Sequence, residues 1–220
     1  MATVQEPIEL TQQRFLLRDA DWRTYKDILE ALGDRPVRLT YDRGRLEFIT
    51  LSHRHERSSE LLGLFVHVLT EELIRPIQSG GSTTFNREDL DRGLEPDKCF
   101  YLENEPKVRD KDELDLNVDP TPDLALEIDI SLSSLNRMGI YAAIRVPEVW
   151  RYDGQKIRVY QLSADGQYVE TERSLHFPFL PMREVEAFLM RRTQMDETSL
   201  VRLFRAWVRE QIAKGWQPSP

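Results

Sequence analysis

One stretch of ten residues, 122–131, alternates strictly between apolar and other residues, and no other part of the chain constrains the fold as tightly. A period of two is typical of a β-strand, whose successive side chains point to opposite faces of a sheet. One side of this predicted strand carries four aliphatic residues, Leu124, Leu126, Ile128 and Ile130. The other side carries Asp123, Ala125, Glu127 and Asp129.

The second side of this strand places three carboxylates in a row. Residues two apart on a strand lie roughly 7 Å from one another, so three unneutralised anions repel. One interpretation is a solvated sheet face, although such faces usually mix in Lys, Thr or Ser. The other, which we favour, is a row that a divalent cation neutralises, because hard cations such as Mg²⁺ take carboxylate oxygens as ligands.

Composition predicts one soluble globular domain that resides in the cytoplasm. The 220 residues are 40% hydrophobic and 31% charged, and no apolar run approaches the roughly 18–20 residues that a membrane helix needs. The N-terminal residues lack the basic and then apolar pattern of a signal peptide. A single cysteine, Cys99, excludes an internal disulfide, favours a reducing compartment and is expected to be a buried apolar residue.

The charge balance bears on nucleic-acid binding. A net charge of −8 and a pI of about 5.2 argue against a protein that binds nucleic acid over its whole surface. This balance still allows an enzyme that contacts DNA locally, through a metal ion and a few arginines.

The order of predicted elements indicates a mixed α/β fold. We expect helices at 21–32, 52–73, 134–144, 182–190 and 197–214, and strands at 37–41, 45–49, 82–86, 93–102, 122–131, 146–152, 156–162 and 168–172. Residues 103–121 lack periodicity and predict a surface loop. The expected architecture is a central sheet with helices packed on it.

We divide the chain into a polar lead-in, a core domain and a C-terminal extension. The lead-in covers residues 1–20, where Phe15 and Leu16 are candidate anchors. The core domain covers 21–192, and a C-terminal helix with its tail covers 193–220.

Four predicted elements could bring charged side chains together. Asp97 begins a strand directly after a proline, and neighbouring strands lie about 4.8 Å apart, so Asp97 and Glu127 could share one cation. Arg137 begins a helix and would supply a fixed positive charge to a phosphate, or would be a solvated helix residue. Glu56 lies in the first turn of the long helix.

Two histidines flank this group on the long helix. The helical period places His55 on its inward face and His53 opposite. His55 is either a hydrogen-bonded structural group, which we favour, or a neighbour of the site. Motifs of other chemistries are absent from the sequence, among them Gly-x-Ser-x-Gly, Gly-x-Gly-x-x-Gly, His-Glu-x-x-His and Cys-x-x-Cys.

An ordered set of motifs resembles a known family. Glu95-Pro96-Asp97, the stretch 122–131, Arg137-x-x-x-Tyr141 and residues 146–150 together resemble the Uma family of restriction-endonuclease-like proteins, in the PD-(D/E)XK nuclease superfamily. The resemblance covers about residues 20 to 190. It implies a restriction-endonuclease-like fold, with a central mixed sheet flanked by helices, DNA as substrate, dependence on Mg²⁺ with Mn²⁺ as a substitute, and often a homodimer.

The resemblance also assigns site residues. It implies Asp97 and Glu127 as metal ligands, helped by Asp129, with Glu56 as the acidic residue of the first core helix. Superfamily members carry lysine two residues after the second acid, where this chain has Asp129. Many Uma-like proteins have a lysine four residues before the helix tyrosine, where this chain has Arg137.

These departures bear on catalysis and on local structure. Arginine remains protonated and cannot serve as a base. Lys98 follows Asp97 directly, so on a strand it should point to the opposite face. Arg145 stands where the family usually has glycine, which should strain the end of the preceding helix.

Two functional hypotheses result. The first is a Mg²⁺-dependent DNA endonuclease in which Asp97, Glu127 and Asp129 hold the metal, with Glu56 as a further candidate, and Arg137 stabilises the phosphate. The superfamily resemblance implies products with a 5′-phosphate and a 3′-hydroxyl. The second is a catalytically degenerate nuclease fold that acts as a DNA-binding or protein-interaction module.

Overall fold

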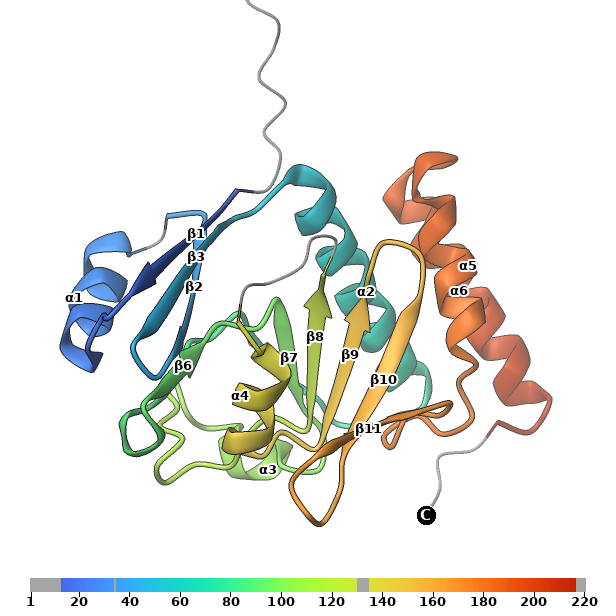
Figure 1. Cartoon of the computed structure of the whole chain (residues 1–220). Helices are drawn as coiled ribbons and strands as arrows, with labels where there is room; N and C mark the ends of the chain where they lie inside the picture. Colours follow the sequence, from blue (N-terminus) through green and yellow to red (C-terminus); the bar gives the residue numbers. More distant parts are fainter. Residues whose placement is uncertain (1–12, 34, 130–134, 217–220) are drawn as a thin grey trace, which may run out of the picture.

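The structure, a computed structural model, describes residues 13–33, 35–129 and 135–216, and it confirms the predicted mixed α/β fold. Its strands form two sheets (Figure 1). The smaller sheet has the order β1-β3-β2-β6-β5 and is antiparallel. The larger sheet has the order β11-β10-β9-β8-β7-β4 and is mixed, because β8 and β9 are parallel while the other pairs are antiparallel.

The strand bounds are as follows. The smaller sheet contains β1 (Arg14–Arg18), β2 (Val37–Asp42), β3 (Arg45–Thr50), β5 (Phe85–Arg87) and β6 (Arg92–Leu94). The larger sheet contains β4 (Gln78–Gly81), β7 (Lys98–Tyr101), β8 (Leu124–Ile128), β9 (Glu148–Tyr152), β10 (Ile157–Leu162) and β11 (Tyr168–Thr171).

The described helices are α1 (Trp22–Leu32), α2 (His53–Glu72), α3 (Glu105–Val108), α4 (Arg137–Ile144), α5 (Met182–Met190) and α6 (Glu197–Ala213), with short 3₁₀ turns η1 (Glu88–Leu90) and η2 (Arg191–Thr193). No described helix has both the length and the apolar character needed to span a membrane.

Helices cover both faces of β8, which explains why all five of its residues are buried. The face with Leu124, Leu126 and Ile128 packs against α2, α5 and α6. The face with Ala125 packs against α4. Figure 1 shows α2 behind the larger sheet and α4 in front of it. The carboxylates of this segment therefore lie inside the protein or at its edge, and the solvated-face interpretation is wrong.

Helix capping fixes where the two helices beside β8 begin. The Ser52 side chain accepts a hydrogen bond from the main-chain N–H of His55, at 3.2 Å. The Asn136 side chain accepts one from the N–H of Gly139, at 3.0 Å. Such caps satisfy amide groups that a helix leaves without partners at its first turn. They set the first residues of α2 and α4 next to the carboxyl end of β8 (Figure 1).

Several local predictions are corrected by the structure. The lead-in contains β1, which pairs with β3, and the segment 103–121 contains α3. The strand predicted at 82–86 is replaced by β4 and β5, which belong to different sheets. The strand predicted at 93–102 is likewise divided into β6 and β7, because Pro96 has no N–H to donate to a ladder and the chain changes sheet there. The predicted strand at 122–131 was expected to end, and the predicted helix at 134–144 to begin, within residues 130–134. These five residues lie outside the described part of the chain.

Two predictions about single residues agree with the structure. Cys99 is fully buried. Arg145 follows α4 with φ 64° and ψ 41°, a left-handed conformation that costs a residue with a Cβ about 1–2 kcal/mol. The helix end is thus strained, as expected for arginine at a position that suits glycine.

Candidate functional site

A cavity of about 120 Å³ lies where the carboxyl end of β8 meets the first turns of α2 and α4. This space takes several waters or one phosphate group, and it is smaller than the pockets of about 300–1,000 Å³ that hold drug-sized ligands. Three of the predicted acids, Asp97, Glu127 and Asp129, line it together with five basic residues, Arg14, Arg38, His55, Arg137 and Arg151.

Asp97 and His55 form a buried pair at one side of the cavity. The Oδ2 atom of Asp97 lies 3.2 Å from Nε2 of His55 and accepts a hydrogen bond of 2.7 Å from the main-chain N–H of Ile128. Burial raises the pKa of Asp97, but His55, Arg137 and the Ile128 N–H together lower it below its usual range. Asp97 is therefore held as a carboxylate.

His55 is held as a cation by the same contacts. Burial lowers the pKa of His55, but the contacts with the carboxylates of Asp97 and Glu56 outweigh it and raise the pKa to about 9. Its Nδ1 atom lies 3.5 Å from Oε1 of Glu56. The structure thus places His55 in the site, whereas the sequence favoured a purely structural role.

Glu127 and Arg137 form a second buried pair. Arg137 donates from Nη2 to Oε1 of Glu127 at 2.5 Å and from Nε to Oε2 at 3.1 Å. It also donates to the Thr40 hydroxyl, and to the main-chain oxygen of Glu95 at 2.8 Å. Burial lowers the pKa of Arg137, and the Glu127 carboxylate more than compensates, so the guanidinium remains charged. The solvated-residue interpretation of Arg137 is wrong.

Tyr141 completes the environment of Glu127. Its hydroxyl donates to Oε1 of Glu127, one helical turn along α4 from Arg137. Burial and the nearby Asp97 charge raise the pKa of Glu127, against the opposing effects of Arg137 and Tyr141. The influence of Asp97 shows that these two predicted ligands lie close enough to interact.

The other two predicted ligands have different surroundings. Asp129 accepts a hydrogen bond from Arg151 of β9, and its Oδ1 lies 3.8 Å from Nη2 of Arg14. The Glu56 side chain is 49% exposed and lies beside the far nitrogen of His55. Lys98 points away, as predicted, and its Nζ lies 2.6 Å from Oε1 of Glu60. Asp97, Glu127 and Asp129 therefore line one cavity, with Asp129 engaged by Arg151, while Glu56 does not line it.

The donor set fits a metal ion only in part. Among the described residues, no group of three or more His, Cys, Asp or Glu side chains is arranged to hold a metal. Mg²⁺, however, is often held by one or two carboxylates together with substrate phosphates and water. Asp97 and Glu127 match that smaller requirement, whereas the four-carboxylate site expected from the sequence is not assembled.

Arg38 differs from the other cations of the cavity. It lies on β2, and within the described residues its side chain forms no ion pair within 4 Å; its Nε is buried without a partner, and its charge helps to lower the pKa of Glu56. The remaining arginines of the cavity, Arg14, Arg137 and Arg151, each lie against a carboxylate. Arg38 therefore leaves the cavity with a positive charge that is available to an anion.

Sequence reasoning missed several of these residues. Tyr141 could have been assigned to the site, because residues four apart on a helix share a face with Arg137. Arg14 and Arg38 lie on the smaller sheet, and Arg151 lies on the strand next to β8. Their positions depend on how the two sheets meet, and no local pattern reports that.

Comparisons with known proteins place the chain in a family and find a solved structure that resembles it in part. The family model Uma2, described as "Putative restriction endonuclease", matches residues 22–189. No curated protein matched the chain. Among solved structures, a "putative nuclease belonging to DUF820 from Anabaena variabilis" is similar over 69% of this chain and 90% of its own, with 16% identity and a TM-score of 0.46.

Proposed function

Because the chain belongs to the Uma2 family, as its motifs predicted, we propose that it is a Mg²⁺-dependent endonuclease that hydrolyses phosphodiester bonds in DNA. The observation that carries the proposal is that Asp97 and Glu127 line one cavity, which is also lined by Arg38, an arginine with no carboxylate within 4 Å among the described residues. A nuclease needs both features, because it must hold a cation and a phosphate at the same place.

Asp97 and Glu127, the proposed metal ligands, are held in place by different contacts. His55 and the Ile128 N–H keep Asp97 ionised and fix its orientation. Glu127 is oriented by Arg137 and Tyr141, and its raised pKa falls when a cation approaches. A bound Mg²⁺ would neutralise phosphate charge and lower the pKa of its bound water.

The basic residues would handle the phosphate. At neutral pH neither His55 nor Arg137 can accept a proton, because both are already protonated. They act as fixed positive charges that favour the additional negative charge of the transition state. Arg38 would bind a non-bridging phosphate oxygen and bring the reacting phosphorus into the cavity.

A cleavage assay tests this proposal. Purified protein with Mg²⁺ or Mn²⁺ should nick or linearise a plasmid, and the Asp97→Asn variant should lose this activity. Asparagine keeps an oxygen for the Ile128 N–H, so the fold is preserved while a charged ligand is removed. Asp112→Asn, at an exposed carboxylate, is the matched control and should cleave normally.

Two results would contradict the proposal. One is equal cleavage by Asp97→Asn and the wild type. The other is cleavage that persists in a chelator, since the reaction would then not need the metal.

A second candidate function is a DNA-binding module that has lost catalysis. The observation in its favour is that Arg137 and Tyr141 already engage Glu127. Binding of DNA without cleavage, at any metal concentration, would support it. The homodimer and the cytoplasmic location implied above stay predictions, which light scattering and cell fractionation would test.

A further inference from the structure

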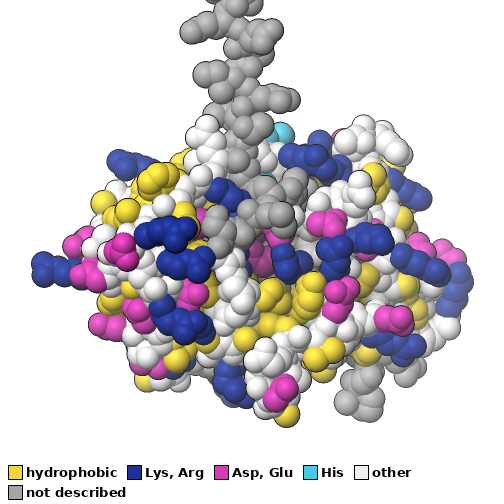
Figure 2. All heavy atoms as spheres, viewed as in Figure 1, with side chains coloured by type: hydrophobic (Ala, Val, Ile, Leu, Met, Phe, Trp, Pro, Cys, Tyr) yellow, Lys and Arg dark blue, Asp and Glu magenta, His cyan; other side chains and the backbone are white. Residues whose placement is uncertain are grey.

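Four arginines gather beside the cavity, where α2 begins and where η2 follows α5. We call Arg54, Arg57, Arg191 and Arg192 the arginine rim. Arg57 donates a hydrogen bond to the main-chain oxygen of Arg192, which joins the two elements. Figure 2 shows dark-blue side chains at the upper edge of the molecule, over the start of α2 and the end of α5.

Three members of the rim, Arg57, Arg191 and Arg192, contact uncharged groups. Arg192 donates from Nη1 to the main-chain oxygen of Leu189 at 2.9 Å. The guanidinium of Arg191 lies 5.2 Å from the ring centroid of Phe188. Arg54 and Arg191 are exposed, and Arg57 and Arg192 are half-buried. Carbonyl and ring contacts orient these side chains without neutralising them.

The rim carries uncompensated charge in an acidic protein. Within the described part of the chain, none of its four guanidinium groups forms an ion pair with a carboxylate. Two acids that are close to these elements in the sequence are engaged elsewhere, since Asp153 pairs with Arg158 and Glu56 lies beside His55. With a net charge of −8 for the whole chain, four adjacent unpaired cations are unusual and indicate a site for an extended anion.

The rim adjoins the cavity through two elements. Arg54 directly precedes His55, which lines the cavity. Tyr152 directly follows Arg151, another lining residue. Burial raises the pKa of Tyr152, and the charges of Arg192 and Arg54 oppose this effect, so both arginines lie near Tyr152. A ligand that fills the cavity and continues beyond it would therefore meet the rim.

We propose that the arginine rim binds the phosphate backbone of double-stranded DNA next to the phosphate that enters the cavity. This inference rests on the proposed nuclease function and names a second contact surface for the same substrate. The cavity has room for one phosphate, whereas duplex DNA carries one negative charge per about 1.7 Å of its axis. Guanidinium forks match phosphate oxygens in geometry, and such contacts position DNA without reading its sequence.

The test measures binding of a fluorescent DNA duplex to the full chain by anisotropy, in EDTA and over a range of salt concentrations. The variant is the double substitution Arg54→Gln and Arg191→Gln, which leaves the Arg57 and Arg192 contacts in place. The matched control, Arg23→Gln with Arg183→Gln, removes the same charge from exposed positions on α1 and at the start of α5.

Loss of two phosphate contacts should weaken binding roughly tenfold and reduce the slope of log K against log salt by about 2, while the control pair changes neither by as much. Equal salt slopes for the rim and control variants would overturn the proposal. So would rim variants that lose binding to vesicles of anionic lipid but bind DNA as the wild type does. If the wild type binds DNA through the rim but does not cleave it, the proposed nuclease function is wrong, whereas DNA binding by the rim is supported.

Discussion

Two buried clusters of charge lie at opposite ends of β8, and they differ in what they leave free. At its carboxyl end are Asp97, Glu127 and their partners, around a cavity. At its amino end, Asp123 accepts hydrogen bonds from the N–H groups of Leu102 and Asn104, at 2.7 and 2.9 Å, and from the Asn104 side chain. Both ends contain a histidine beside a carboxylate.

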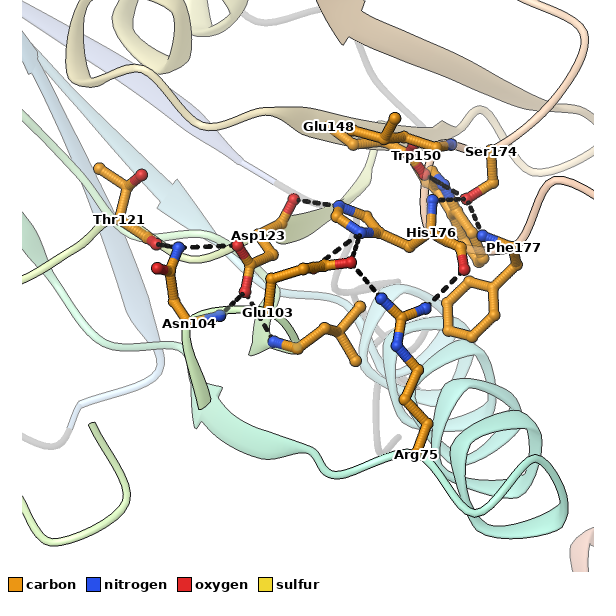
Figure 3. Close-up of polar contacts among 12 residues, drawn as sticks. Arg75, Glu103, Asn104, Thr121, Asp123, Glu148, Trp150, Ser174, His176 and Phe177 are labelled. Atoms are coloured by element: carbon orange, nitrogen blue, oxygen red, sulfur yellow. Dashed lines mark hydrogen bonds and ion pairs between the residues drawn. The ribbon is translucent and has the colours of Figure 1, made fainter. Parts of the chain in front are cut away.

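In the amino-end cluster the polar side chains bind one another and nearby main-chain groups (Figure 3), and we call it the closed cluster. Nε2 of His176 contacts the main-chain oxygen of Asp123 at 2.8 Å, and Nδ1 contacts Glu103. Arg75 donates both to Glu103 and to the main-chain oxygen of His176. Glu148 accepts from Ser174, Trp150 and the Leu175 N–H. The named side chains have found their partners within the protein.

The comparison shows which features distinguish a candidate site from a structural cluster. Buried histidines and carboxylates occur at both ends, so burial and an altered pKa do not by themselves indicate function. The carboxyl end adds a cavity lined by Asp97 and Glu127, and it is lined as well by Arg38, whose Nε is buried without a partner. The Tyr101 hydroxyl near Asp123 is also buried without a partner, but it does not line this cavity. Buried polar groups are normally satisfied, and an exception calls for a ligand or another explanation.

The first prediction concerns the pair that most resembles the closed cluster, Glu127 and Arg137. Arg137→Ala should lower the free energy of unfolding by about 3–5 kcal/mol, because it leaves a buried carboxylate without its counter-ion. Urea denaturation measures this. The same variant should impair cleavage more than it impairs Mg²⁺ binding measured by calorimetry, if Arg137 acts on the phosphate.

Arg23→Ala is the control, since Arg23 pairs with Asp27 between two exposed positions on α1, and its loss should change stability much less. A loss below about 1 kcal/mol for Arg137→Ala would mean that water reaches Glu127 in the variant. Equal losses of cleavage and metal binding would make the role of Arg137 structural.

The second prediction concerns Glu148 in the closed cluster. Glu148→Gln replaces an acceptor oxygen with an NH₂ group that faces other donors, and it should cost about 1–3 kcal/mol of stability. Cleavage by the folded fraction should remain unchanged, since Glu148 does not line the cavity. A variant of normal stability that has lost cleavage would break the distinction between the two ends.

The sequence predicted those parts of the fold that local patterns determine. The helix predicted at 21–32 is α1, which Asp21 caps and Gly33 ends, and the strands predicted at 37–41 and 45–49 are the paired strands β2 and β3. The prediction failed where the chain changes sheets, at Gly80–Gly81 and at Pro96. Tertiary pairing decides to which sheet a short strand belongs, and three-residue strands such as β5 and β6 carry too little pattern to reveal it.

The same limit applies to the site. Glu127 and Arg137 were predicted to converge on one site, with Arg137 acting on a phosphate. The structure brings them together, with Arg137 hydrogen-bonded to Glu127 itself. The alternating pattern of β8 also grouped Asp123 with Glu127, but the structure places them in separate clusters. Periodicity reports which face a residue occupies, and it does not report what lies above each end of a strand.

The third prediction concerns Arg38, which distinguishes the open end. Arg38→Gln should change stability by less than about 0.5 kcal/mol, because no ion pair is lost. Cleavage should fall roughly tenfold, which corresponds to about 1.4 kcal/mol of transition-state stabilisation. Rates measured with saturating metal provide the test, and Arg35→Gln, at an exposed position three residues away, is the control. Identical rates for the two variants would leave Arg38 without a role in phosphate binding.

The smallest expected effect is a pH dependence of stability at the closed end. Burial lowers the pKa of His176, but Glu103 and the other partners outweigh it and raise the pKa above its ordinary 6.5. The stability that His176 contributes is therefore complete below pH 6.5 and is lost as pH rises through the raised pKa. Burial raises the pKa of Glu103, but His176 and Arg75 lower it to about 2, so its contribution is present above about 4.5 and fades as pH falls toward 2. The pair therefore stabilises most between these limits.

Because the Glu103 side chain is 55% exposed, solvent screening should hold this contribution to about 0.2–1 kcal/mol. The measurement is the difference in unfolding free energy between the wild type and Glu103→Gln, at about pH 5.5 and again at about pH 9. The difference should be larger at the lower pH, where His176 is charged and can attract the carboxylate. If it is the same at both values, His176 is neutral throughout, and the closed end is held by hydrogen bonds without a net ion pair.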